Sequence, residues 1–169
     1  RVPNVGAANT AGSTLVDAIP AGTTYRAGTT TLNGATVPDL PGGVMPFTQP
    51  QLINSPGAPP GQIVAGAAAV VQFQVTVGPN VTSEIINIAS ADEDGPLGPL
   101  PPREARTFNP VVNLAASKTD TLVFDTAPPG GSPGDTLEYT IAIVNRGSGA
   151  ASDVRFTDGI PANTAYVPN

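Results

Sequence analysis

The sequence predicts an all-β protein, an antiparallel β-sandwich repeat that is incomplete or permuted within the chain. Glycine (19) and proline (20) interrupt almost every long window of the 169 residues, which excludes a helical core. Several short segments alternate apolar and polar residues, as half-buried strands do. Residues 17–25 also recur as residues 158–166, with six of nine positions identical at an offset of 158 − 17 = 141. Such a period indicates a window cut across a tandem array.

In the first part of the chain, a short strand is expected from Leu15 to the Ile19-Pro20 corner. A second strand is expected at residues 23–25, where β-branched and aromatic side chains suit a pleated surface. Prolines and glycines punctuate residues 38–60, so this segment is expected to be loop.

The clearest strand of the first half lies at residues 71–77, where apolar and polar side chains alternate strictly. Its apolar face consists of Val71, Phe73, Val75 and Val77. The next strand is expected at residues 85–91, and the acidic residues that follow are expected to end it. Residues 95–102 are rich in proline and glycine, and we expect them to form a stiff, extended linker between two repeats.

The second half of the chain begins a new repeat at residues 111–123, and residues 137–144 form another strictly alternating strand. Its apolar face consists of Leu137, Tyr139, Ile141 and Ile143. We therefore divide the chain into residues 1–109, a partial sandwich repeat that lacks its opening strands, and residues 110–169, the opening strands of the next repeat. An open sandwich exposes unpaired backbone edges. The strand at 137–144 is therefore expected to pair across a unit boundary, not with strands of residues 1–110.

The composition excludes several classes of function. The chain has no cysteine, histidine or tryptophan. Without cysteine there is no disulfide scaffold or thiolate metal site, and without histidine the usual general base is missing, so we expect no enzyme. The net charge of −6 and the isoelectric point near 4.3 argue against a nucleic-acid partner. No apolar run approaches the ~20 residues of a membrane-spanning helix, so no membrane insertion is expected.

Two surface positions are candidate sites for a metal or a modification. Asp92, Glu93 and Asp94 offer the carboxylate oxygens that Ca²⁺ prefers, which makes Ca²⁺ the one cofactor to consider. Their spacing does not fit an EF-hand loop, however, and acidic turns are usually just solvated. Asn80 begins an Asn-Val-Thr sequence, the acceptor signal for N-glycosylation, at an expected turn, although a three-residue match often arises by chance.

The ordered set of motifs resembles one known family. It comprises residues 134–145, 154–166 and 86–89, with Lys118 standing where such repeats carry a lysine in their first strand. Together these segments resemble the DUF11 repeat of prokaryotic surface and secreted proteins. The resemblance implies an Ig-like β-sandwich module strung in arrays on large secreted or envelope proteins, and it implies no catalytic activity.

Lys118 and Asn87 are candidates for a covalent cross-link. Surface β-sandwiches of pilins and adhesins can join a lysine of the first strand to an asparagine of the last through an isopeptide bond, helped by a protonated acid. Asn87 lies in a closing strand and Lys118 in an opening strand, and either Asp17 or Asp158 would be the acid. The simpler alternative is that Lys118 is an ordinary strand lysine and Asn87 a hydrogen-bonded neighbour of a turn.

These features predict a structural role. We expect a building block of an extracellular filament, stalk or surface layer, assembled head-to-tail with strand complementation between successive units. Its partners would be copies of itself or adjacent repeats of the same polypeptide, at the cell surface. The alternative is an adhesin-type binding module, because residues 27–83 contain one charged side chain, Asp39, and such a face could hold a ligand or carbohydrate.

Overall fold

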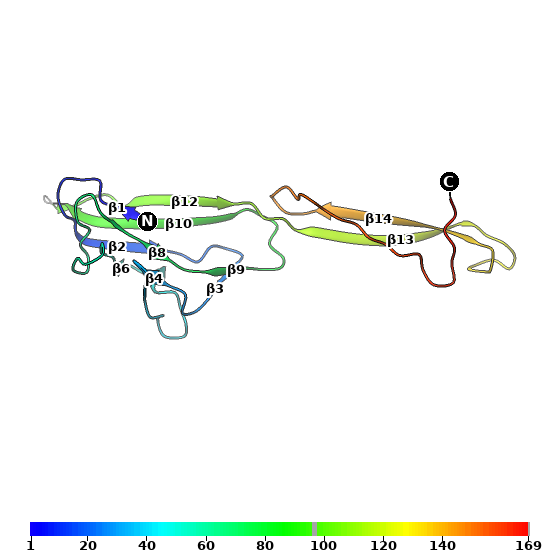
Figure 1. Ribbon diagram of the computed structural model, residues 1–169, viewed down its shortest axis with the longest axis horizontal. Helices are drawn as coiled ribbons and strands as arrows, with labels where there is room; N and C mark the ends of the chain where they lie inside the picture. Colours follow the sequence, from blue (N-terminus) through cyan, green and yellow to red (C-terminus); the bar gives the residue numbers. More distant parts are fainter. Residues whose placement is uncertain (96–97, 169) are drawn as a thin grey trace.

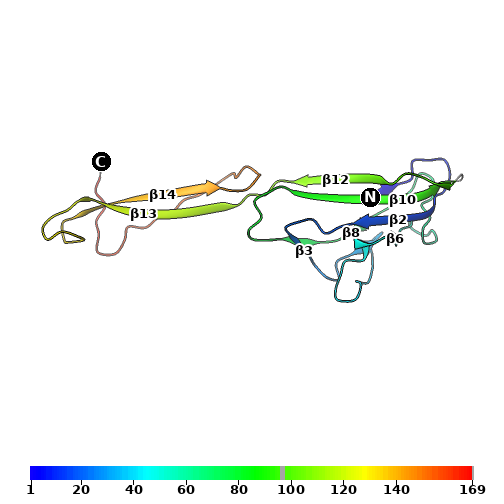
Figure 2. The same cartoon turned by 180° about the vertical axis from the view of Figure 1, so that it is seen from behind.

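The computed structural model describes residues 1–95 and 98–168, and it shows an elongated, all-β molecule whose strands pair in antiparallel sheets. The only helical element in this described part is a three-residue 3-10 turn, η1 (Pro46–Thr48). Residues 1–110 form a packed body, and one hairpin projects from the body along the long axis of the molecule (Figures 1 and 2). The predicted fold class is therefore confirmed.

The larger sheet of the body is organised around one long strand, β10 (Ile85–Gly95). β10 pairs on one side with β2 (Ala11–Asp17) and on the other with β12 (Arg103–Asn109). Two short strands extend this sheet, β6 (Gln51–Leu52) beside β2 and β11 (Gly98–Pro99) beside β10. Because side chains alternate along a strand, Leu15 and Asp17 turn to the same, buried face of β2.

The facing layer is built from short ladders along the extended segment 68–77. This segment contains β7 (Ala68–Ala69), β8 (Val71–Gln72) and β9 (Val75–Val77). Their partners are β1 (Val2–Pro3) for β7, β4 (Thr31–Leu32) for β8, and β3 (Thr23–Tyr25) for β9. A further strand, β5 (Ala35–Thr36), forms a tight hairpin with β4. The predicted alternation is present, because the side chains at 71, 73 and 75 are half-buried while those at 72, 74 and 76 are exposed.

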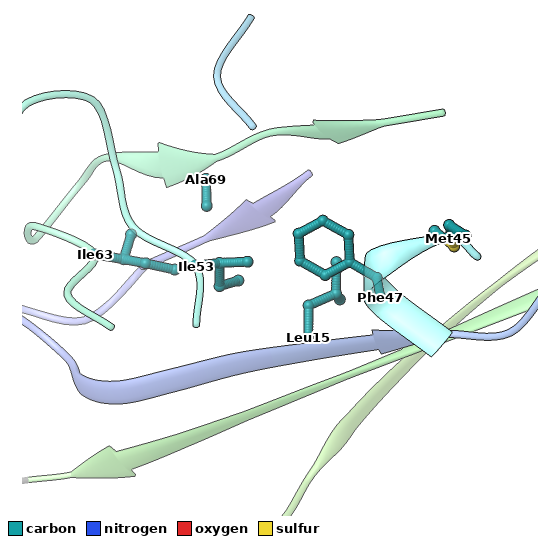
Figure 3. Close-up of a cluster of buried hydrophobic side chains, with 6 residues drawn as sticks. All are labelled: Leu15, Met45, Phe47, Ile53, Ile63 and Ala69. Atoms are coloured by element: carbon teal, nitrogen blue, oxygen red, sulfur yellow. The ribbon is translucent and has the colours of Figure 1, made fainter. Parts of the chain in front are cut away.

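The core of the body is a small cluster of buried apolar side chains (Figure 3). The cluster consists of Leu15, Met45, Phe47, Ile53, Ile63 and Ala69. Met45, Phe47 and Ile53 come from residues 38–60, which are almost free of regular strand, as predicted, but which fold back into the interior. The expectation that the apolar face of residues 71–77 forms the core is wrong in part, since Val71 and Phe73 only flank the cluster.

The ends of two strands differ from the sequence prediction. β2 begins at Ala11 instead of Leu15, because its small polar residues pair with the second half of β10. It ends at Asp17, short of the Ile19-Pro20 corner, since proline has no N–H for a ladder. The acidic residues after position 91 do not end β10, because β2 pairs with them across a register irregularity between Asp92 and Asp94.

Residues 95–102 do not form the expected linker between repeats. Residues 96 and 97 lie outside the described part, but Asp94 pairs with Pro99 and Gly95 with Gly98, so the chain reverses here. Gly98 has a φ of 117°, which is accessible because glycine has no Cβ. β12 then runs back along β10, and the chain leaves the body only after β12.

The projecting hairpin consists of β13 (Leu114–Phe124) and β14 (Thr136–Asn145), which the sequence predicted as strands. Their register runs from Leu114 opposite Asn145 to Phe124 opposite Thr136. Among the described residues, β14 pairs with β13 and with no strand of the body. Residues 146–168 run back along the hairpin without forming a strand (Figure 1).

Replacing Phe47 with Ala should destabilise the body by about 3–5 kcal/mol, because its ring is almost fully buried and its removal leaves a cavity. Urea unfolding of the 169-residue chain, followed by circular dichroism, measures the change. The matched control is Val5→Ala, at a side chain that is 93% exposed, which should change the free energy of unfolding by less than about 0.5 kcal/mol. Similar effects of the two substitutions would contradict this assignment of the core.

Candidate functional site

The repeat seen in the sequence recurs in the hydrogen bonds of the backbone. The side-chain amide of Asn4 donates to the carbonyl of Ala8 (2.8 Å), and its Oδ1 accepts from the N–H of Gly6 (3.0 Å). Asn145 makes the same two bonds, with the carbonyl four residues ahead (2.6 Å) and the N–H two residues ahead (3.0 Å). Asn4 and Asn145 are separated by the repeat offset of 141 residues, so both form the same turn.

Backbone angles repeat at the same offset. Gly12 and Asp153 have φ values of 61° and 54°, and Gly22 and Asn163 have φ values of 77° and 64°. A positive φ is uncommon for any residue but glycine. Its presence at both counterparts therefore indicates that residues 145–168 begin to build the same structure as residues 4–27.

This equivalence identifies β1. Because Asn4 corresponds to Asn145, Val2 and Pro3 correspond to Ile143 and Val144, the end of β14. β1 is thus the last piece of an opening strand of the body's own repeat, and its pairing with β7 marks where that strand belongs. The signal was present in the gap-free sequence offset, but sequence reasoning missed it because only the fold reveals the partner of β1.

Next to β1, a groove of about 690 Å³ enters the body between its two layers. Val2 and Val71 line the groove from one layer, and Leu15, Asp17 and Ala89 line it from the other. The interior face of the body is therefore accessible along the line that a longer β1 would follow.

One backbone edge of segment 68–77 has a strand partner only at β1, within the described residues. The carbonyl of Val70 accepts from the N–H of Asn33 (2.7 Å), which places even-numbered residues toward the β3 and β4 side. The carbonyl of Ala67 accepts from the N–H of Asn4 (2.9 Å), on the β1 side. Because successive residues of an extended chain direct their N–H and C=O groups to opposite edges, residues 71, 73, 75 and 77 turn theirs to the β1 side. We call this the acceptor edge.

The hairpin carries an apolar face that no second sheet covers in the described structure. Leu137, Tyr139 and Ile143 of β14 remain 40%, 37% and 42% exposed, and Ile141 between them is half-buried. A two-stranded hairpin by itself is marginally stable in water. The molecule therefore has an open groove in the body and an uncovered apolar strand outside it.

Asp17 is a buried acid in the wall of this groove. It is 7% exposed, and its Oδ1 has no hydrogen-bond partner in the described residues, nor does the buried Oδ1 of Asn87. Asp17 lies opposite Ala89, so its side chain and that of Asn87, two residues before Ala89, turn to the same face of the sheet. Burial raises the pKa of Asp17 above its ordinary value of 3.8, while the neighbouring Asn87 carboxamide lowers it. An orphaned pair of polar atoms in such a wall calls for a partner.

Lys118 forms the second part of the candidate cross-link on β13. Its Nζ lies 2.7 and 2.9 Å from the two carboxylate oxygens of Asp158, and 4.7 Å from the centroid of the Tyr139 ring. Asp158 is the counterpart of Asp17 at the offset of 141 residues. Within one chain the four candidate residues thus fall into two pairs, Asp17 with Asn87 in the body and Lys118 with Asp158 on the hairpin (Figure 1).

The other candidate residues are not assembled into a site. In the residues that the structure describes, no three acidic side chains gather as a metal ion would require. Asp92 and Asp94 are exposed, and Glu93 turns to the opposite face of β10. Asn80 is exposed in a turn, where a glycan would find room, and its glycosylation stays a prediction.

The low charge of residues 27–83 has a structural explanation. This stretch supplies Met45, Phe47 and Ile53 to the core. Its one charged side chain, Asp39, accepts hydrogen bonds from the Tyr25 hydroxyl (2.6 Å) and from the N–H of Gly28 (2.7 Å), so it holds a loop in place. The stretch therefore accounts for its own composition without a ligand.

No family model matches the chain, and no curated protein or solved structure matches it either. In the described residues no helix is long and apolar enough to cross a membrane. Function is therefore inferred from the groove, the hairpin and the two side-chain pairs.

Asp17 should make the stability of the dilute chain depend on pH. Its raised pKa means that ionisation is harder in the folded chain than in the unfolded chain, so the free energy of unfolding should fall as the pH rises above 3.8. The variant Asp17→Asn should lack this fall. Urea unfolding at a series of pH values measures both profiles, and parallel profiles would show that Asp17 is not desolvated in the folded chain.

Proposed function

We propose that the protein is a structural building block of an extracellular filament, stalk or surface layer. In such an assembly the β13–β14 hairpin of one copy would complete the body of the next copy. The observation that carries this proposal is the equivalence of β1 with the end of β14. β1 already occupies one end of the acceptor edge, so the rest of that edge suits the rest of an opening strand.

β1 also sets the register of the proposed pairing. Val2 lies opposite Ala69, and Val2 corresponds to Ile143. If the antiparallel pairing continues, each step back along β14 meets one step forward along segment 68–77. Ile141 then lies opposite Val71, Tyr139 opposite Phe73, and Leu137 opposite Val75. The two alternating faces of the sequence thus meet residue by residue.

The backbone edges fit this register. The carbonyl of Asn113 accepts from the N–H of Arg146 (2.7 Å), which places even-numbered residues of β14 toward β13. The odd-numbered residues of β14 therefore direct their N–H and C=O groups to the free edge of the hairpin. Odd-numbered residues also face the acceptor edge of the body, so the proposed register pairs donors with acceptors along both strands.

Burial of the apolar face would drive the association. Covering Leu137, Ile141 and Ile143 in the groove stabilises the complex by about 1.5–3 kcal/mol for each side chain that becomes fully buried. Tyr139 would meet Phe73, which already lies 6.5 Å from the Tyr25 ring between centroids, and an aromatic pair adds about 0.5–1.5 kcal/mol. These contributions also give the marginal hairpin the second sheet that it lacks.

The geometry of the contact leads to a filament. The surface that donates, the hairpin, differs from the surface that accepts, the groove, so the contact is head-to-tail and leaves a free donor and a free acceptor at the ends. Residues 152–158 of the donor cannot follow β14 into the acceptor, since their counterpart, β2, already occupies that place. An adjacent repeat of the same polypeptide can supply the hairpin in the same register.

A location outside the cell is part of this proposal. It is supported by the resemblance to DUF11 repeats, which are modules of secreted and envelope proteins. The absence of cysteine and histidine also suits a structural module better than an enzyme.

The register predicts one specific disulfide between copies. In the proposed pairing Gln74 of one copy lies directly opposite Glu138 of another, on the exposed face, as a non-hydrogen-bonded pair with Cβ atoms about 4.5–5.5 Å apart. The natural chain has no cysteine to interfere. Mixing a Gln74→Cys chain with a Glu138→Cys chain under mild oxidation should give a disulfide-linked dimer on a non-reducing gel.

The matched control replaces Glu138→Cys by Val144→Cys, six residues further along the same face of β14. This second mixture should give no specific dimer. Equal yields from the two mixtures, or none from the first, would refute the register. Negative-stain microscopy of the unmodified chain tests the function itself, because regular fibres are expected of a building block and isolated rods of an adhesin-type module.

A further inference from the structure

Strand exchange in the register derived above would unite the two side-chain pairs that one chain keeps apart. On the hairpin, Lys118 lies opposite Ile141 and over the Tyr139 ring, so it belongs to the face that would enter the groove. Asp17 lines that groove, with Asn87 beside it. Lys118 of the donor would therefore face Asp17 and Asn87 of the acceptor.

The chain itself contains a template for this contact. Lys118 already binds Asp158, the counterpart of Asp17, with both carboxylate oxygens within hydrogen-bond distance. The turns at Asn4 and Asn145 are alike, so the hairpin stands in the same relation to Asp158 as a completing hairpin would to Asp17. On exchange Lys118 would leave one aspartate and meet its equivalent.

We propose that Lys118 of one copy and Asn87 of the next copy join in an isopeptide bond across the exchanged strands, with Asp17 as the catalytic acid. This inference rests on the proposed function and adds a covalent bond at each junction. It places the bond between copies, because within one chain Lys118 and Asn87 lie in different parts of the molecule.

The reaction is balanced without any further reactant. The Lys118 ammonium first gives a proton to the Asp17 carboxylate, since a buried site favours a neutral amine and a neutral acid over two charges. The Asp17 O–H then donates to Oδ1 of Asn87, and Nζ of Lys118 attacks the polarised Cγ. The Cγ–Nδ2 bond breaks, the leaving nitrogen takes a second proton from Nζ, and ammonia departs.

The unsatisfied atoms of the acceptor have roles in this step. Oδ1 of Asp17 receives the proton of the amine, and Oδ1 of Asn87 receives the hydrogen bond of the acid. Lys118 is the single lysine of the sequence. Every amide cross-link formed by a lysine side chain must therefore involve it, which makes the test unambiguous.

The test uses the 169-residue chain after assembly, viewed by negative stain and then boiled in SDS. Wild-type material should form fibres and then run as a ladder in steps of 16.9 kDa, with a loss of about 17 Da for each junction. A digest should contain a peptide that joins residues 87 and 118. The substitutions Lys118→Arg, Asn87→Ser and Asp17→Asn should each abolish the ladder, and Lys118→Arg should retain the fibres.

Two controls separate this inference from simpler explanations. Asp125→Asn, at an exposed position, should retain both fibres and ladder. Asp158→Asn should also retain the ladder, whereas Asp17→Asn should not, although the two aspartates are equivalent in sequence. Fibres that dissolve to monomers in SDS would overturn the covalent bond and leave the proposed function intact. Absence of both fibres and ladder would overturn both, and a ladder from Lys118→Arg would overturn the assignment of the bond.

Discussion

The acceptor edge of segment 68–77 is the constraint on which the rest of this structure depends. One side of the segment is satisfied by β3 and β4, and the other is satisfied only at β1 in the described residues. Backbone groups and apolar side chains left open in this way favour pairing with another strand. The counterpart of the missing strand lies at the other end of the same chain, on a hairpin that reaches away from the body (Figure 2). Both halves of one interface are thus present in one chain but are held apart.

This separation explains why the body is small and loop-rich. A sandwich without its opening strands cannot bury both faces between long strands, so its core shifts to the end that remains closed. There the proline-rich segment around η1 supplies Met45 and Phe47 as a plug over β2. Its glycines make the tight turns that this route requires, as Gly42 and Gly43 show with φ values of 84° and 73°. The open end keeps the groove.

Polar groups at the open end are arranged for an incoming partner instead of for the isolated body. A buried acid without a counter-charge destabilises the chain that holds it. Asp17 has this unfavourable position, whereas its counterpart Asp158 is paired with Lys118. The same residue type in the same repeat is satisfied where the hairpin is present and unsatisfied where the hairpin is missing. That contrast within one molecule supports the proposed exchange independently of the apolar faces.

The sequence by itself determined the strand class, the period of 141 residues and the two alternating faces at 71–77 and 137–144, because these follow from local alternation and identity. It also singled out Lys118, Asn87, Asp17 and Asp158 from residue chemistry. Only the tertiary structure decided how these residues pair, that Phe47 belongs to the core and that β12 turns back along β10. Those outcomes depend on contacts between residues far apart in the chain. Proline- and glycine-rich segments carry no periodic signal that would reveal which of their side chains become buried.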